Sequence, residues 1–220
     1  MRLPMALACT VLVVMSACIP GAVQTLSPLR VAATSAAEPW LRNAYDCTPT
    51  GSGIVLTTPD QADMILRLAE PQPLLGAAYQ VGTDDLLVVT HPQVAVGPLS
   101  ADQVEALFAG QVQNWLELGG ADVDVQVWTY APTVDVQSYF EQTILHGRPI
   151  TSLARLAVSA QDMSDSVGSS PGAVGLLPRH WKAGNTRDVL TVAALPVLAL
   201  TDETPKGSLA ELVACMQTKR

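Results

Sequence analysis

The sequence of 220 residues contains few aromatic and few basic side chains. Only two Phe, four Trp and four Tyr are present, and 12 Lys and Arg stand against 20 Asp and Glu, for a net charge of −8. A surface that binds nucleic acid or an anionic bilayer needs clustered Lys and Arg to replace counterions. The scarcity of such residues excludes both partners, although acidity by itself identifies no ligand.

Sequence motifs of common catalytic and metal sites are also missing. The three histidines, His91, His146 and His180, are far apart in the chain, and no CxxC or HxxxH spacing occurs. The carboxylates form no recognisable acid and base pair. We therefore expect no catalytic residues, no metal and no cofactor, and we interpret the chain as a protein other than an enzyme.

A long apolar run lies at the N-terminus. Arg2 precedes ten largely apolar residues, 5–14, about half of the roughly 20 that cross a bilayer. The sequence Met-Ser-Ala-Cys18 follows and resembles a bacterial lipobox, in which the cysteine carries lipid. We expect a lipoprotein signal peptide at 1–18, a tether at 19–28 and an exported protein anchored to the membrane. The alternative is an ordinary signal peptide cleaved nearby.

The chain has only four cysteines, and two of them lie in the N-terminal segment. Cys9 would leave with the signal peptide and Cys18 would carry lipid, so Cys47 and Cys215 remain. In an oxidising compartment we expect them to form a disulfide. Closing so long a loop is worth about 4–5 kcal/mol in the chain-entropy model. The alternative is two buried free thiols.

Short β-type runs alternate with helical patterns, which predicts an α/β fold. The strands are expected at 29–33, 54–57, 64–68, 85–90, 123–128, 173–177 and 195–200. The helices are expected at 35–46, 101–109, 136–144, 161–167 and 209–216. Ser35 with Glu38, and Ser100 with Gln103, have the spacing of a capping box, and Asp135 is expected to N-cap the helix that begins at residue 136.

Residues 99–122, LSADQVEALFAGQVQNWLELGGAD, contain a helix ending in Phe-Ala-Gly, then Asn-Trp, then Gly-Gly. This order resembles the phosphate-binding-protein family of bacterial ABC importers. Four further segments resemble that family in the same order along the chain: 29–39, 86–92, 171–175 and 206–216. Five segments in sequence order make a chance match improbable.

The resemblance implies a type II periplasmic-binding-protein fold, with two α/β lobes of mixed sheets flanked by helices and a ligand held between them. The first lobe would combine 29–88 with 185–220, and the second would be 89–184. The implied function is that of a solute-binding lipoprotein, which delivers a small solute, in this family an anion, to an ABC permease. The alternative is an adaptor or sensor that does not transport and has a degenerate cleft.

The ligand residues of the family carry over only in part. Thr34, Ser35 and Ala36 match its first ligand loop, but Tyr130 stands where the family has an Arg, and Val-Asp135-Val replaces Ser-Gly-Thr. The lost groups would make charge-assisted hydrogen bonds worth about 1.5–3 kcal/mol each. We therefore expect no phosphate site. The ligand should be neutral, zwitterionic or cationic, or else bind mainly through Thr34 and Ser35.

Three further residues complete the candidate ligand set: Thr83, Asp84 and Thr133. Each candidate also has a purely structural alternative. Asp135 can serve as an N-cap alone, a strand-end Thr can bond to the backbone, and 83–85 can be a solvated turn. For Arg67, near a strand end, we favour a surface ion pair over a role as an anion partner.

Overall fold

The computed structural model describes residues 27–219. Its strands are β1 Ser27–Ala33, β2 Ser52–Leu56, β3 Met64–Leu68, β4 Ala77–Thr90, β5 Gln126–Thr129, β6 Arg155–Leu156, β7 Ala173–Pro178 and β8 Arg187–Thr201. Its α-helices are α1 Leu41–Asp46, α2 Ala101–Phe108, α3 Asp135–Thr143, α4 Ala160–Ser169 and α5 Gly207–Thr218. Short 3₁₀ turns are η1 Glu38–Trp40, η2 Pro59–Gln61, η3 Pro92–Val94, η4 Trp115–Leu118 and η5 Arg179–Trp181.

The strands form one mixed sheet in the order β2-β1-β3-β8-β4-β7-β5-β6. Parallel pairs lie at the two ends, where β1 joins β2 and β3, and β5 joins β6 and β7. In the middle β4 and β8 are antiparallel and pair from Ala77 with Thr201 to Thr90 with Arg187. The expected α/β class is confirmed. Where we expected separate sheets, this long central pair joins them into one.

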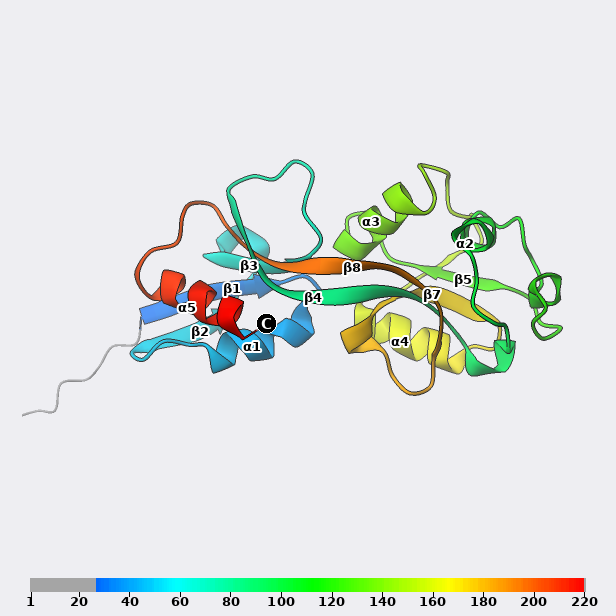
Figure 1. Ribbon diagram of the computed structural model, residues 1–220, viewed down its shortest axis with the longest axis horizontal. Helices are drawn as coiled ribbons and strands as arrows, with labels where there is room; N and C mark the ends of the chain where they lie inside the picture. The colour runs from blue at the N-terminus through cyan, green and yellow to red at the C-terminus, as the bar shows by residue number, and fades with distance from the viewer. Residues whose placement is uncertain (1–26, 220) are drawn as a thin grey trace, which may run out of the picture.

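Figure 1 shows two lobes connected by β4 and β8. We call the half with β1–β3, α1 and α5 lobe 1, and the half with β5–β7 and α2–α4 lobe 2. The predicted boundaries at residues 88 and 185 fall within β4 and just before β8. Because both strands run through both lobes, the assignment of single residues at these boundaries stays a prediction.

Strand β4 carries the most deeply buried segment of the central pair. Leu86, Leu87, Val88 and Val89 are all fully buried, as expected of a strand covered on both faces. The strand begins eight residues before the apolar run that predicted it. Polar residues such as Gln80 and Thr83 hide this extension from a search for apolar runs.

The helix starts were predicted with mixed success. For α2 the capping box is present, because Ser100 Oγ accepts from Gln103 N and Gln103 Oε1 accepts from Ser100 N, at 3.2 and 2.9 Å. The capping box at Ser35 was wrong: residues 35–37 form a turn, η1 follows, and α1 begins only at Leu41. Pro39, which favours a first turn, lies inside η1 and starts the helical segment later than the polar pattern suggests.

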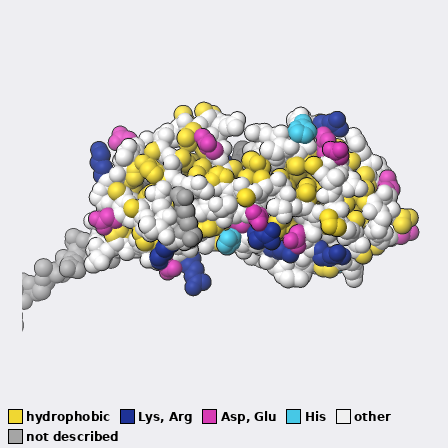
Figure 2. All heavy atoms as spheres, viewed as in Figure 1, with side chains coloured by type: hydrophobic (Ala, Val, Ile, Leu, Met, Phe, Trp, Pro, Cys, Tyr) yellow, Lys and Arg dark blue, Asp and Glu magenta, His cyan; other side chains and the backbone are white. Residues whose placement is uncertain are grey.

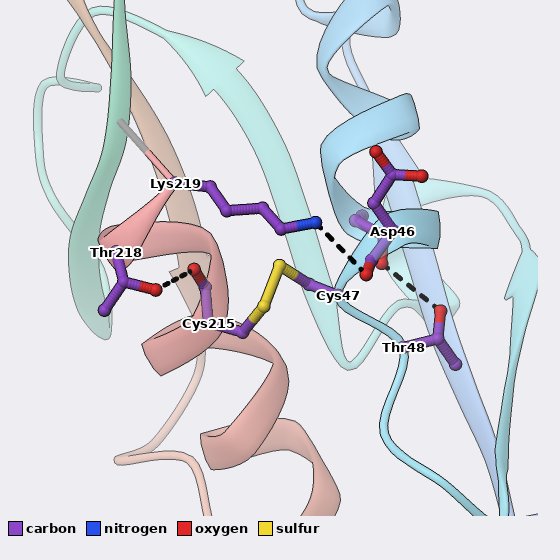
Figure 3. The surroundings of a disulfide bond; sticks show 7 residues. Asp46, Cys47, Thr48, Cys215, Thr218 and Lys219 are labelled. Carbon is purple, nitrogen blue, oxygen red and sulfur yellow. Dashed lines mark hydrogen bonds between the residues drawn. A yellow bond between two sulfur atoms is a disulfide. The ribbon is translucent and has the colours of Figure 1, made fainter.

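A disulfide joins Cys47, just after α1, to Cys215 in α5, with Cα atoms 5.6 Å apart. The pairing predicted from the sequence is therefore present. Figure 3 shows a second link beside it, in which Lys219 Nζ donates to the Asp46 carbonyl at 3.3 Å. Both links lie in lobe 1 and fasten the last helix to the first.

The segment that carried the family resemblance forms part of the core of lobe 2. Trp115 is fully buried and its indole N–H donates to the Gly172 carbonyl at 2.8 Å. The rings of Phe108 and Phe140 lie 4.7 Å apart and tilted, which ties α2 to α3. These contacts fix the position of α3, whose N-terminal end points toward lobe 1.

The predicted signal peptide, the lipidation site Cys18 and nearly all of the tether lie outside the described residues. In the range 27–219, none of the helices has the length and apolarity needed to span a bilayer. On the face of the molecule that Figure 2 shows, Lys and Arg side chains lie beside Asp and Glu side chains and form no continuous basic patch.

Candidate functional site

A cleft of about 500 Å³ lies between the lobes. Lobe 1 contributes Arg67 and the loop after β3, and lobe 2 contributes one face of α3 with the loop before it. Its lining residues are Arg67, Ala69, Glu70, Pro71, Gln72, Thr133, Asp135, Ser138, Tyr139, Gln142, Thr143 and Pro196. Hydroxyl and amide groups dominate this wall, with one guanidinium and two carboxylates.

The Asp135 carboxylate connects the two lobes. It is only 3% exposed, and its Oδ2 accepts hydrogen bonds from the Thr34 hydroxyl at 2.7 Å and the Leu68 N–H at 2.9 Å. Both donors belong to lobe 1, at the ends of β1 and β3. The other oxygen, Oδ1, accepts from the Val136 N–H at 2.9 Å. Three donors thus surround a charge that is removed from water.

This arrangement corrects the predicted N-cap. Helix α3 begins at Asp135 itself, its N-cap is Val134, and no side chain caps it. The carboxylate still accepts from the Val136 N–H in the first turn of the helix, but its shorter hydrogen bond goes to Thr34 in the other lobe. The prediction failed because a capping pattern is local, whereas the hydrogen-bond donors of lobe 1 come from segments distant in sequence.

The first predicted ligand loop is placed at the interface between the lobes. The Thr34 side chain reaches Asp135, while its backbone N–H donates to the Leu66 carbonyl at 2.9 Å. Ser35 is half-buried, and Ala36 is buried with its carbonyl accepting from the Trp181 indole N–H at 3.2 Å. The loop therefore joins the lobes through two contacts, one to α3 and one to η5.

Arg67 is half-buried and lines the cleft. Its Nε donates to the Leu68 carbonyl at 3.3 Å, and the described residues include no carboxylate within ion-pair distance of it. The favoured surface ion pair was therefore wrong. Burial lowers the pKa of its guanidinium, and the nearby Asp135 charge acts in the opposite direction. The other N–H groups of the guanidinium can donate to a ligand.

Tyr130, which stands where the family has an Arg, points away from the cleft. It is 2% exposed, its hydroxyl donates to the Leu176 carbonyl at 2.9 Å, and its N–H donates to Gln137 Oε1 at 3.1 Å. Burial, followed by the charges of Asp135 and Asp162, raises the pKa of this phenol. Tyr130 is a core residue of lobe 2, so the guanidinium is lost without replacement at that position.

Thr83 and Asp84 lie on β4, outside the set of described residues that line the cleft. Thr83 is exposed and accepts from Gln80 Nε2 at 3.3 Å. Asp84 is 3% exposed, with His180 Nδ1 3.0 Å from its Oδ2. The structure therefore places Thr133 and Asp135 in the cleft lining and joins Thr34 to Asp135 by a hydrogen bond, whereas Thr83 and Asp84, like Ser35 and Ala36, lie outside that lining.

Several groups in or beside the cleft were not among the predicted ligand residues: Glu70, Ser138, Gln142 and the Leu68 N–H. One signal could have found those after β3. Open α/β sheets bind ligands at the carboxyl ends of their parallel strands, and β1 and β3 are parallel neighbours. In the described part of the chain no group of three or more His, Cys, Asp or Glu is arranged to hold a metal ion.

Two α/β lobes joined by an antiparallel pair of strands, with a polar cleft between the lobes, define the class of two-lobed periplasmic binding proteins. The family model described as PBP superfamily domain matches residues 76–218. The chain belongs to this family, which comprises binding proteins rather than enzymes.

A curated relative is the phosphate-binding protein PstS of Bacillus subtilis (strain 168), 25% identical over 100 residues. The match covers 45% of this chain and 33% of the relative, so the chain spans about a third of that protein's length.

Solved structures share the fold at low identity. A phosphate ABC transporter substrate-binding protein with bound phosphate from Clostridium perfringens has a TM-score of 0.78 at 13% identity, covering 86% of this chain and 93% of that one. The regulatory domain of HypT from Salmonella typhimurium has a TM-score of 0.60 at 14% identity, covering 89% and 95%. At such identities the likeness concerns the fold alone.

Proposed function

We propose that the chain is an extracytoplasmic solute-binding lipoprotein of a phosphate-type ABC importer, and that its solute is a zwitterionic or neutral organic molecule rather than phosphate. The solute would lie in the interlobe cleft and pass to an ABC permease. Cys18 would hold the protein at the outer face of a membrane. The protein would perform no catalysis.

The transport role is supported by the relatives. One is named a phosphate-binding protein and another a substrate-binding protein of a phosphate ABC transporter. Shared ancestry favours the same mode of action, in which two lobes enclose a solute. It does not specify the solute, because the residues that hold it differ between this chain and the family pattern.

Arg67 is the observation that carries the proposal. A half-buried guanidinium that lines a cleft and has no ion-pair partner among the described residues is a strong site for a carboxylate. Burial lowers its pKa from the ordinary value, which indicates that the surroundings stabilise its charge incompletely. A bound carboxylate would supply the missing negative charge.

The charges of the cleft favour a zwitterion over a free oxyanion. Glu70 and Asp135 each carry a carboxylate there, against one guanidinium. A phosphate dianion would add two negative charges to a cleft that is already net negative, and Coulomb repulsion would oppose it. An amino-acid-like solute instead offers a carboxylate to Arg67 and an ammonium group to Glu70. Ser138 and Gln142 can donate hydrogen bonds to its neutral groups.

A thermal-shift screen of the purified protein tests the proposal, with phosphate, sulfate, neutral polyols and zwitterionic amino acids as probes. A probe at 100 times its dissociation constant should stabilise the protein by about 2.7 kcal/mol. We expect a zwitterionic or neutral probe to raise the melting temperature and phosphate to leave it unchanged. Calorimetry then gives the dissociation constant of each positive probe.

Arg67→Gln is the informative variant and Arg42→Gln its control, because Arg42 is exposed on α1 and lies outside the cleft lining. We expect the first variant to lose binding of a carboxylate-bearing probe at least tenfold and the second to retain it. Micromolar binding of phosphate by the unmodified protein, or equal affinity in the two variants, would contradict the proposal.

A second candidate function is an extracytoplasmic adaptor or sensor that does not transport and has a degenerate cleft. The observation that favours it is the Asp135 carboxylate, which bridges the lobes through hydrogen bonds within the chain. The fold likeness to the HypT regulatory domain is compatible with it. If no probe shifts the melting temperature while the lobes remain closed, this second function is favoured.

A further inference from the structure

Two hydrogen-bond donors of lobe 1 converge on a single point between the lobes. The Thr34 hydroxyl follows β1 and the Leu68 N–H ends β3, and both donate to Asp135 Oδ2, at 2.7 and 2.9 Å. Because β1 and β3 are parallel neighbours, both donors lie at the carboxyl edge of the sheet, where α/β folds bind ligands. The group that fills this position belongs to lobe 2 of the same chain.

We propose that the Asp135 carboxylate is an intramolecular ligand, which occupies a carboxylate-binding site of lobe 1 and thereby holds the lobes closed when no solute is bound. The chemical class of the site is that of a small monocarboxylate. This inference goes beyond the proposed function, since it holds whether or not the neighbouring cleft takes up a solute.

Burial and hydrogen bonding both indicate a built site. A carboxylate that is 3% exposed is costly to bury unless donors surround it. Here Thr34 and Leu68 serve Oδ2 and the Val136 N–H serves Oδ1. The Asp135 charge also acts on Arg67 across the cleft. Two of the three hydrogen bonds exist only while the lobes are together, so they favour the closed arrangement.

Covalent attachment gives this carboxylate an advantage over any free anion. A free anion loses translational and rotational freedom on binding, whereas Asp135 is already positioned by α3. Free formate, acetate or phosphate would have to displace a group whose local concentration is far higher. Asp135 thus determines specificity, because it keeps small anions out of this site in the intact protein.

Removal of the side chain should open the lobes and expose the site. In Asp135→Gly the missing group corresponds to acetate, so acetate is the probe for chemical rescue. Nitroxide labels at Leu75→Cys and Leu153→Cys, which are 78% and 84% exposed, report the distance between the lobes by electron paramagnetic resonance. We expect one narrow short distance in the parent protein, a longer and broader distribution in Asp135→Gly, and a return to the short distance on addition of acetate.

The matched control is Asp102→Asn. Asp102 also lies in the first turn of a helix, α2, but it is exposed on lobe 2. We expect this variant to retain the parental distance with and without acetate. Thr34→Val is the second test variant, because it keeps the carboxylate and removes one donor from lobe 1. It should shift the distribution partly toward long distances.

Two results would overturn the inference. One is a parental distance in Asp135→Gly without acetate. The other is an open distribution that acetate leaves unchanged. Should Asp135→Gly fail to fold, a parental distance in Thr34→Val would overturn it instead. These readouts differ from the solute screen, so the inference and the proposed function fail independently.

Discussion

Replacing Thr34 with Val removes one hydroxyl and keeps the shape of the side chain. The lost hydrogen bond joins a neutral donor to the buried Asp135 carboxylate at 2.7 Å. Hydrogen bonds to charged groups contribute about 1.5–3 kcal/mol, and the acceptor retains its bonds from Leu68 and Val136. We therefore expect the free energy of unfolding to fall by about 1.5–3 kcal/mol. For a chain of this size, that lowers the melting temperature by roughly 3–12 °C.

A double-mutant cycle with Asp135→Asn isolates this interaction. In the Asn background the acceptor is neutral, so Thr34→Val should cost only about 0.5–1.5 kcal/mol. The central values of these two ranges differ by about 1 kcal/mol. Urea denaturation of the parent, the two single variants and the double variant, with the disulfide intact, measures the free energy of unfolding of each protein. Equal costs in both backgrounds, or a cost below about 0.3 kcal/mol in the parent, would refute the reasoning.

Three further outcomes follow from other contacts. Cys215→Ser removes a disulfide that spans 168 residues, and the free energy of unfolding should fall by up to about 5 kcal/mol, measured by urea denaturation; an unchanged midpoint would contradict this. Gly82→Ala places a methyl group against the Trp40 ring, so it should cost about 1–3 kcal/mol and alter the near-ultraviolet circular dichroism, whereas an unaltered spectrum would show that the ring had not moved. The Arg30 guanidinium lowers the pKa of Asp63, so this ion pair stabilises the fold fully above the ordinary Asp pKa of about 4 and loses that effect as the pH falls through the lowered pKa. Asp63→Asn should therefore destabilise the protein more at pH 7 than at pH 2. An equal destabilisation at both pH values would exclude the ion pair as the cause.

Several scaffold features were predictable because the residues that form them also carry the sequence signal. Ser100 and Gln103 lie three residues apart and form the capping box that their spacing predicts. The apolar stripe of α3 buries Val136 and Phe140 as its helical period requires. The disulfide also followed from simple reasoning, because few cysteines remained to pair. In each case the sequence signal and the stabilising contact concern the same few residues.

The extent of the central strands was less predictable. Strand β4 includes Gly82 and Asp84, whose residue types are depleted in strands. These residues are held in the strand by pairing with β8, which runs from Ala77 opposite Thr201 onward with three register shifts. Pairing between strands so far apart in the sequence overrides local preference, and an apolar run therefore marks only the buried middle of such a strand.

The site depended on contacts that no local pattern encodes. Asp135 meets Thr34 across 101 residues and Leu68 across 67. In sequence, its position at a helix start looks the same whether the carboxylate caps the helix or bridges to another lobe. Local sequence was equally uninformative for Arg67, whose side chain could have paired with a surface carboxylate or lined the cleft. Only the packing of β1 and β3 against α3 separates these alternatives.

The differences between this sequence and the family pattern at the start of α3 have a consistent physical interpretation. A free anion requires donors in both lobes, and the sequence lacks the guanidinium and hydroxyls that the family pattern places in lobe 2. Lobe 1 nevertheless contains two donors, the Thr34 hydroxyl and the Leu68 N–H. Without an acceptor, the buried Leu68 N–H would have no hydrogen-bond partner. A carboxylate at position 135 satisfies that donor from within the chain. We therefore propose that Asp135 supplies, from within the chain, the negative charge that a bound anion would otherwise bring between the lobes.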